Sequence, residues 1–277
     1  MLLTIDIGNT QSTFGVYTAD ELQATWRVST HAGATPDELL ILLTALLGAR
    51  ELALPDITAV CLGSVVPELT RAWTGACAAA GLPVPLLPAQ IAPRDLGLTS
   101  AQAATVGADR LANAVAARAR YGAPAVVVDF GTATNLDVID SEGHFVGGPI
   151  SAGLELSAEA LYAHAARLAA VELAAPTRII AQTTEDALRA GLVVGEAAKV
   201  DGLVVRIAEE LGAGDGSSPP QDCGGEEPSP RALPVIATGG LAPLIAPHSR
   251  TITACDTTLT LDGLHLLARD ALRGEQV

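Results

Sequence analysis

The chain has 277 residues, of which 49% are hydrophobic, and its formal net charge is −15 at pH 7. A chain of this length and composition can bury the cores of two globular domains and is not expected to be disordered. Its acidic surface would repel nucleic-acid phosphates and anionic lipids, so we expect no nucleic-acid partner and no membrane partner. Asp6 interrupts the first apolar run and no C-x-x-C pair occurs, which favours a cytoplasmic protein with free thiols.

In the first half of the chain, apolar residues predict a β-hairpin at 2–7 and 11–18 and a third strand at 22–28. Thr35 followed by Pro36 and two acids is a helix-start signature, and the leucine stripe behind it predicts a helix as far as Leu47. Further patterns predict a strand at 57–62, a helix at 67–80, a short strand at 84–87, an irregular segment at 88–106 and a helix at 107–121.

The second half of the chain repeats the order of the first. The patterns predict a hairpin at 125–140, a strand at 144–146, a glycine-rich loop at 147–153, helices at 157–168 and 184–211, a strand at 235–237, a turn at 238–240, a helical turn at 241–245 and a last helix at 261–272. The repeat predicts two α/β domains, one of residues 1–121 and one of residues 122–277.

Residues 213–231 interrupt the second half. They are rich in Gly, Pro, Ser, Asp and Glu, a composition that predicts a flexible surface excursion. Gly212, Gly214 and Gly216 also suggest a nucleotide-binding loop, but no strand leads directly into them and prolines follow. The linker interpretation is therefore the better one.

The two predicted hairpins share an unusual turn, in which an acid ends the first strand and glycine and hydroxyl residues follow. Asp6 precedes Gly8-Asn9-Thr10, and Asp129 precedes Gly131-Thr132-Ala133-Thr134. One such turn is also typical of an ordinary hairpin, but two copies, one at the start of each half, are harder to attribute to turn formation alone. Turn N–H groups and hydroxyls suit phosphate oxygens and a carboxylate suits a cation, so the turns predict a site for a metal-bound phosphate.

Three further motifs occur along the chain besides the two turns: Gly107-Ala108-Asp109-Arg110, the glycines from Gly147 to Gly153, and Thr238-Gly239-Gly240. In the order and spacing of these motifs and the two turns, the chain resembles the type III pantothenate kinases. That family belongs to the superfamily of actin, sugar kinases and heat-shock chaperones. The resemblance therefore implies an α/β fold of two duplicated actin-like ATPase domains, ribonuclease H-like, with the nucleotide in the interdomain cleft. It also implies ATP-dependent phosphorylation of pantothenate, the first step of coenzyme A biosynthesis.

The resemblance gives the residues of both turns a role. The first turn would hold the phosphates of ATP with Asp6, Ile7, Gly8, Asn9, Thr10, Gln11, Ser12 and Thr13. Within it, Asp6 would face Mg²⁺ through water, as positioning and charge neutralisation dominate phosphoryl transfer. In the second turn, Thr132 would contact ATP and Asp129 would bind a monovalent cation, K⁺ or NH₄⁺. An acid at a buried strand end needs a cationic or hydrogen-bonded partner, so an ion there is physically reasonable.

The substrate site is implied at Gly107, Ala108, Asp109 and Arg110, with Asp109 as the general base for the primary hydroxyl of pantothenate. The residues alone leave an alternative, in which Asp109 complements a helix dipole and Arg110 is solvated. Thr184 would reach pantothenate from the partner subunit of a homodimer. Its alternative is a plain helix N-cap.

Assembly and activity are the last expectations. The predicted helices near 154–168 and 188–205 are rich in Ala, Leu and Val around more than one face, which favours a homodimer. Residues 94–106 hold no aromatic where the family usually has one, so an alternative is a catalytically weak or inactive regulatory relative. A sugar or acyl kinase of the same superfamily is less favoured, because the Gly-Ala-Asp-Arg motif stands where the pantothenate signature belongs.

Overall fold

The computed structural model describes residues 1–92, 96–165, 168–212 and 233–274. Contacts divide the chain into two compact units, Met1–Ala116 with Thr258–Val277 as unit 1 and Ala117–Thr257 as unit 2. The division expected from the sequence, after residue 121, differs from this chiefly at the C-terminus, where the last helix joins unit 1. The flexible excursion predicted at 213–231 lies outside the described residues.

Unit 1 is built on a four-stranded sheet in the order β3-β2-β1-β4, with β1 antiparallel to β2 and parallel to β4. Its strands are β1 (Leu2–Ile7), β2 (Gln11–Thr18), β3 (Glu21–Ser29) and β4 (Ala59–Ser64). Its helices are α1 (Pro36–Gly48), α2 (Pro67–Ala79), α3 (Pro88–Ile91), α4 (Ser100–Ala103), the first part of α5 (Ala108–Tyr121) and α10 (Leu259–Gly274), with a 3₁₀ turn η1 (Leu54–Asp56).

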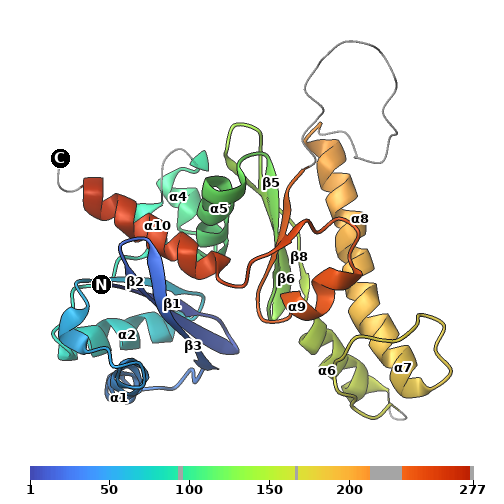
Figure 1. The fold of residues 1–277 in the computed structure, drawn as a ribbon, viewed down its shortest axis with the longest axis horizontal. Coiled ribbons are helices and arrows are strands. Elements are labelled where there is room, and N and C mark those ends of the chain that lie inside the picture. The colour runs from blue at the N-terminus through green and yellow to red at the C-terminus, as the bar shows by residue number, and fades with distance from the viewer. Residues whose placement is uncertain (93–95, 166–167, 213–232, 275–277) are drawn as a thin grey trace. The chain divides into compact units, whose positions relative to one another are not determined.

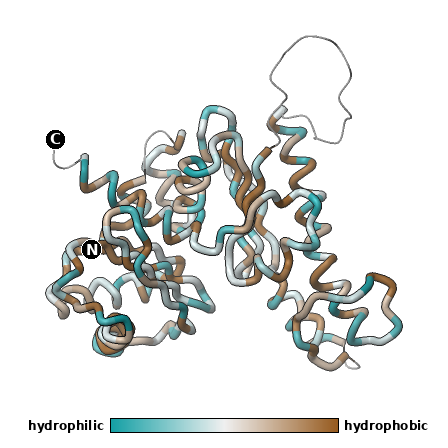
Figure 2. The backbone as a smooth tube through the Cα atoms, in the orientation of Figure 1, coloured by the Kyte–Doolittle hydropathy of each residue, from teal (hydrophilic) through white to brown (hydrophobic). Residues whose placement is uncertain are grey.

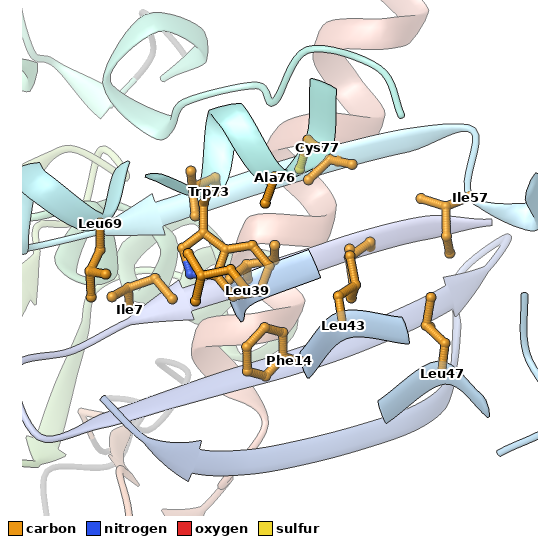
Figure 3. Packing of buried hydrophobic residues seen from close by; sticks show 14 of the residues in the cluster. Ile7, Phe14, Leu39, Leu43, Leu47, Ile57, Leu69, Trp73, Ala76 and Cys77 are labelled. Atoms are coloured by element: carbon orange, nitrogen blue, oxygen red, sulfur yellow. The ribbon is translucent and has the colours of Figure 1, made fainter. Parts of the chain in front are cut away.

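One face of this sheet packs against α1 and α2. Alternation along β1 sends Leu3, Ile5 and Ile7 to the same face, where they join a buried cluster with residues of both helices. Figure 3 shows Phe14 and Trp73 within this cluster, and their ring centroids are 5.3 Å apart. Burial of these side chains fixes the register of β1, which in turn fixes where Asp6 emerges.

The other face of the sheet is covered by α10, which contacts β1, β2 and β4 (Figure 1). The helix also lies directly against α5, because a Cβ at Gly263 would overlap the backbone carbonyl of Ala112. Beside this contact, the Thr260 hydroxyl donates to Asn113 Oδ1 at 2.8 Å. The close approach explains why the C-terminal helix belongs to unit 1.

We expect Gly263→Ala to lower the free energy of unfolding by about 1–3 kcal/mol, because the added methyl group forces the two helices apart. Urea denaturation of the purified variant measures the change. Gly202→Ala is the matched control, since Gly202 is also helical and nothing lies within 4 Å of its missing Cβ. The control should be neutral or slightly more stable than wild type. Equal stability of the two variants would contradict the packing described for Gly263.

Unit 2 contains a six-stranded sheet with the path β10-β9-β5-β6-β7, and β8 pairs with β6 off this path. Its strands are β5 (Ala125–Phe130), β6 (Ala133–Ile139), β7 (Phe145–Gly147), β8 (Ile150–Ala152), β9 (Val235–Thr238) and β10 (Ala254–Cys255). Its helices are α6 (Leu154–His164), α7 (Thr184–Arg189), a π-helix η3 (Ala190–Val194), α8 (Gly195–Glu210), α9 (Ala242–Ile245) and a 3₁₀ turn η4 (Ala246–His248).

The core of unit 2 lies between its sheet and α8. Val126 and Val128 of β5 share a buried cluster with Ala197, Val200 and Val204 of the helix. Figure 2 shows the central strands of this sheet as largely hydrophobic. Small and β-branched side chains fill this core, so the helix can approach the sheet closely. No helix among the described residues is long and apolar enough to cross a membrane.

Three sequence predictions need correction. The strand predicted at 84–87 is a single bridge between Leu86 and Cys61, since Leu86 exchanges hydrogen bonds only with the edge of β4. The segment predicted as irregular at 88–106 contains α3 and α4, and a capping box between Thr99 and Gln102 starts α4. The glycine-rich segment at 147–153 contains the short strand β8, and α6 begins at Leu154 rather than at 157.

Candidate active site

In unit 1, the first acid turn closes the hairpin between β1 and β2. Asp6 is half-buried and stands opposite Thr13 of β2 and Gly63 of β4. The Gly8 N–H donates to the Gln11 carbonyl at 3.0 Å and closes the turn. Asn9, Thr10 and Gln11 are exposed at its tip. The turn thus presents exposed polar groups next to a carboxylate, the arrangement predicted from the sequence.

Thr30 fixes the shape of this turn from the adjacent loop. Its N–H donates to the Thr10 carbonyl at 2.9 Å, and its hydroxyl donates to the Gly8 carbonyl at 2.9 Å. The Ser12 hydroxyl lies 2.8 Å from the same Thr30 hydroxyl and is buried. Ser12 therefore has a structural partner inside the protein, and Ile7 is fully buried in the core. No local pattern in the sequence indicates Thr30, because its contacts depend on the pairing of β2 with β3.

The start of α5 lies at the same end of this sheet as Asp6. A Cβ at Gly63, the register partner of Asp6 on β4, would lie 3.4 Å from the Ala108 Cβ. Register partners on neighbouring strands direct their side chains to the same face of a sheet. Unit 1 therefore brings Asp6 and the Gly107–Arg110 motif to one face and one end of its sheet.

Asp109 occupies the first turn of α5 and is half-buried. Its Oδ1 accepts a hydrogen bond from the Arg110 N–H at 2.9 Å, and a Cβ at Gly107 would overlap the same oxygen. Gly107 is thus required for this position of the carboxylate. Burial raises the pKa of Asp109 above its ordinary value of 3.8, while the Arg110 N–H bond and the Arg110 charge lower it in part. A carboxylate with a raised pKa is better suited to accept a proton.

In unit 2, Asp129 lies near the end of β5 between two polar register partners, Asn135 on β6 and Thr238 on β9. The backbone at Gly239 approaches the carboxylate so closely that a Cβ there would lie 2.5 Å from Asp129 Oδ1. Gly239 also has a φ of +89°, which favours glycine. The Thr-Gly-Gly turn therefore forms one wall beside Asp129.

Asn135 is a residue that sequence reasoning did not assign to the site. Its Oδ1 is buried and, among the described residues, has no hydrogen-bond partner. Directly opposite residues of an antiparallel pair have Cβ atoms about 4.5–5.5 Å apart on the same face, so this oxygen belongs to the Asp129 side of the sheet. An unpaired amide oxygen beside a carboxylate fits a cation that takes oxygen ligands. No group of three or more His, Cys, Asp and Glu able to hold a metal ion occurs within the described part of the chain.

Thr132 is exposed in the turn that follows Asp129. The Gly131 N–H donates to the Ala133 carbonyl at 3.0 Å, and the Gly153 N–H donates to the Thr132 carbonyl at 3.0 Å. The glycine-rich segment that precedes α6 therefore lies against this turn. Asp129 near the end of β5 and Thr132 in the following turn are therefore neighbours in unit 2.

Thr184 is the first residue of α7 and is exposed. The N-cap is its neighbour Thr183, whose hydroxyl accepts a hydrogen bond from the Asp186 N–H at 3.1 Å. The alternative interpretation of Thr184 as the helix cap is therefore wrong by one residue. Within the described residues, the Thr184 side chain makes no hydrogen bond.

Known structures share this fold. A protein of Campylobacter jejuni assigned to the Baf family of transcriptional activators aligns over 98% of this chain and 99% of its own, with a TM-score of 0.58 and 18% identity. MreB 5 of Spiroplasma citri, bound to AMPPNP, aligns over 99% of this chain and 98% of its own, with a TM-score of 0.50 and 12% identity. At such identities the likeness concerns the fold alone. It confirms the predicted actin-like α/β class with two sheets.

Sequence relatives are much more similar. A type III pantothenate kinase from Desulfosudis oleivorans is 39% identical over 275 residues, which cover 98% of this chain and 100% of the relative. A type III pantothenate kinase from Acidothermus cellulolyticus is 41% identical over 268 residues, which cover 96% of this chain and 97% of the relative. The profile of the same family matches residues 2–206. The chain therefore belongs to the type III pantothenate kinase family.

Proposed function

We propose that the protein transfers a phosphoryl group from ATP to the primary hydroxyl of pantothenate, the first step of coenzyme A biosynthesis. Family membership over nearly the full chain supports this activity. The observation that carries it at the level of residues is the half-buried Asp109, which has a raised pKa and lies on the same face of the unit 1 sheet as Asp6. The regulatory alternative gains no support from the relatives, which are named as kinases.

In the proposed reaction, the pantothenate hydroxyl oxygen attacks the γ-phosphorus of ATP and the bond to the ADP oxygen breaks. The hydroxyl proton passes to Asp109, which acts as the general base. Arg110 follows directly and supplies a cation for the carboxylate or hydroxyls of pantothenate. Gly107 keeps the carboxylate in position, because any side chain there would displace Oδ1.

ATP phosphates would be held by the first turn, chiefly through exposed Asn9, Thr10 and Gln11 and the turn backbone. Asp6 would bind Mg²⁺ through water, which neutralises phosphate charge. Thr132 would contact the nucleotide from unit 2. The roles of Ser12 and Ile7 are then to support the turn rather than to offer side chains to ATP, since one is bonded to Thr30 and the other is buried.

A coupled assay of ADP release with pantothenate, Mg²⁺ and K⁺ tests the activity. We expect turnover that depends on pantothenate. Turnover equal to the background without pantothenate would remove the proposal. Calorimetry with pantothenate would then distinguish a catalytically weak kinase from a regulatory relative, since a regulator with an intact fold should show no pantothenate binding.

The proposed cation site uses Asp129 and the unpaired Asn135 oxygen, and it would take K⁺ or NH₄⁺. We expect turnover to require one of these ions, and Asp129→Ala to abolish both the activity and its ion dependence. Asn135→Ala should retain turnover at saturating K⁺ but require more K⁺ to reach it, because one uncharged ligand is lost. Initial rates in KCl, NH₄Cl and NaCl at equal ionic strength measure this. Equal rates in sodium and potassium would contradict the cation role.

We also propose a homodimer with shared active sites in the cytoplasm. Unit 2 exposes several large apolar side chains, including Ile150, Leu156, Leu161 and Val205. Exposed apolar surface of this kind is typical of a protein interface. The exposed hydroxyl of Thr184 lies in the same unit and would reach pantothenate in the partner subunit. The described cysteines are all free thiols, which is consistent with a reducing compartment.

A further inference from the structure

The chain contains a single lysine, Lys199, and it belongs to a polar network beside the Asp129–Thr134 turn. Its Nζ lies 2.7 Å from Glu196 Oε1, one helical turn earlier on α8. The same Glu196 oxygen accepts a hydrogen bond from the Thr134 hydroxyl at 2.6 Å. Both Thr134 and Glu196 are buried, at 1% and 7% exposure. Burial of a carboxylate costs desolvation free energy unless the group is paired in this way, so these contacts are a specific part of the interior and not an incidental surface ion pair.

Lys199 also contacts β8, which lies within the glycine-rich segment of residues 147–153. Its Nζ donates to the Ser151 hydroxyl at 2.9 Å and to the Ala152 carbonyl at 3.3 Å, both on β8. The next residue, Gly153, donates its N–H to the Thr132 carbonyl at 3.0 Å. The Lys199 ammonium group therefore connects α8 to Ala152, and the next residue, Gly153, is hydrogen-bonded to Thr132.

The turn is thus fixed from two sides. Glu196 holds Thr134 on β6, and Lys199 holds Ser151 and Ala152 on β8, which pairs with β6 at Thr134 and Ala133. Figure 1 shows β6, β8 and α8 within unit 2. The π-helix η3 ends immediately before α8, and such helices are frequent at functional sites.

We propose that Lys199 and Glu196 are positioning residues for the nucleotide. They fix Thr132 and its turn in the conformation that binds ATP, and neither touches the reacting atoms. This inference rests on the proposed function, in which Thr132 contacts ATP. Loss of the lysine charge leaves Glu196 buried without its cation and releases β8 from α8, so the turn loses its fixed position.

Lys199→Met tests the role, because it keeps the length of the side chain and removes the charge. We expect the KM for ATP to rise about tenfold or more, as is typical when a supporting contact to a binding group is lost. The kcat and the KM for pantothenate should stay close to wild type. Lys199→Arg, which keeps a cation in reach of Glu196, should restore much of the ATP affinity.

Asp201→Asn is the matched control on the same helix. Asp201 accepts hydrogen bonds from Ser249 and from the N–H groups of Arg250 and Thr251, so its network supports a different segment. This variant should lose some stability and keep the KM for ATP. If both variants raise the KM for ATP equally, or if Lys199→Met leaves it unchanged, the positioning role is wrong.

A second measurement uses the wild-type protein and does not depend on the folding of a variant. With one lysine in the chain, Lys199 and the N-terminal amine are the only amines that acetic anhydride can convert to stable amides, and mass spectrometry resolves the two. Saturating ADP should slow acylation of Lys199 severalfold and leave the N-terminal amine unchanged. Equal rates with and without ADP would overturn the inference. Calorimetry that detects no nucleotide binding to wild type would instead overturn the proposed function, and this inference with it.

Discussion

Asp109→Asn is expected to lower kcat about 10²–10⁴-fold, the loss typical of removing a general base. The amide keeps the size of the side chain and can still accept the Arg110 N–H bond seen at 2.9 Å. It cannot take up the hydroxyl proton of pantothenate. Steady-state rates at saturating ATP and pantothenate measure the loss, and calorimetry should show that both still bind.

The stability of this variant gives an independent check. A carboxyl group whose pKa is higher in the folded than in the unfolded state adds to the free energy of unfolding at low pH. This contribution is complete below the pKa of the unfolded state and is lost as the pH rises through the pKa of the folded state. Burial raises the pKa of Asp109, so its charged form is the less favourable one at neutral pH. Asp109→Asn should then be at least as stable as wild type at pH 7.

For the same reason, the pKa read from the acid limb of the wild-type pH profile of kcat/KM should lie above 3.8. A variant that keeps near-wild-type turnover would make Asp109 a helix cap and not a base.

Mixed dimers should regain activity from two inactive parents. Asp109→Asn lacks the proposed base, and Thr184→Arg places a large cation where the hydroxyl should reach the partner's substrate. In the mixed dimer, one site combines the wild-type Asp109 of one subunit with the wild-type Thr184 of the other. Random exchange should give about a quarter of the wild-type activity, since half the dimers are mixed and each has one intact site. The ADP-release assay on equimolar mixtures measures it.

Thr184→Ser is the control for this experiment, because it keeps the hydroxyl and should be active alone. Light scattering that gives a monomer of the 28.1 kDa chain mass would refute the dimer. A dimer without recovery of activity in the mixture would keep the assembly and remove the shared site.

Much of the fold was predictable from local patterns. The two hairpins with acid turns follow from alternation and from turn residues, and α1 follows from a cap and an apolar stripe. Elements of two to four residues, such as α3, β8 and β10, span too few residues for periodicity to indicate them. The predicted strand at 84–87 has a strand-like composition, but only Leu86 pairs with the outer edge of β4, through a single bridge to Cys61.

The site was less predictable, because its contacts depend on register and packing. The sequence shows Asn135 as a polar residue in a strand, but only the pairing with β5 places it beside Asp129. Thr30 likewise contacts a turn, and Lys199 contacts the strand β8, that are remote from them in the sequence. The position of Thr184 one residue after the cap follows from the backbone at Thr183, which no local pattern distinguishes between two adjacent threonines.

The discontinuity of unit 1 has a consequence for biosynthesis. Unit 2 is one continuous segment, Ala117–Thr257, whereas unit 1 needs α10, which the ribosome makes after all of unit 2. Domains fold as units while the chain emerges, so the half that is synthesised first should be completed second. Until α10 arrives, the sheet face around Gly15 and Gly63, which Leu261 and Leu264 contact, has no cover. The nascent chain therefore carries an uncovered sheet face in unit 1 until unit 2 has been made and α10 follows.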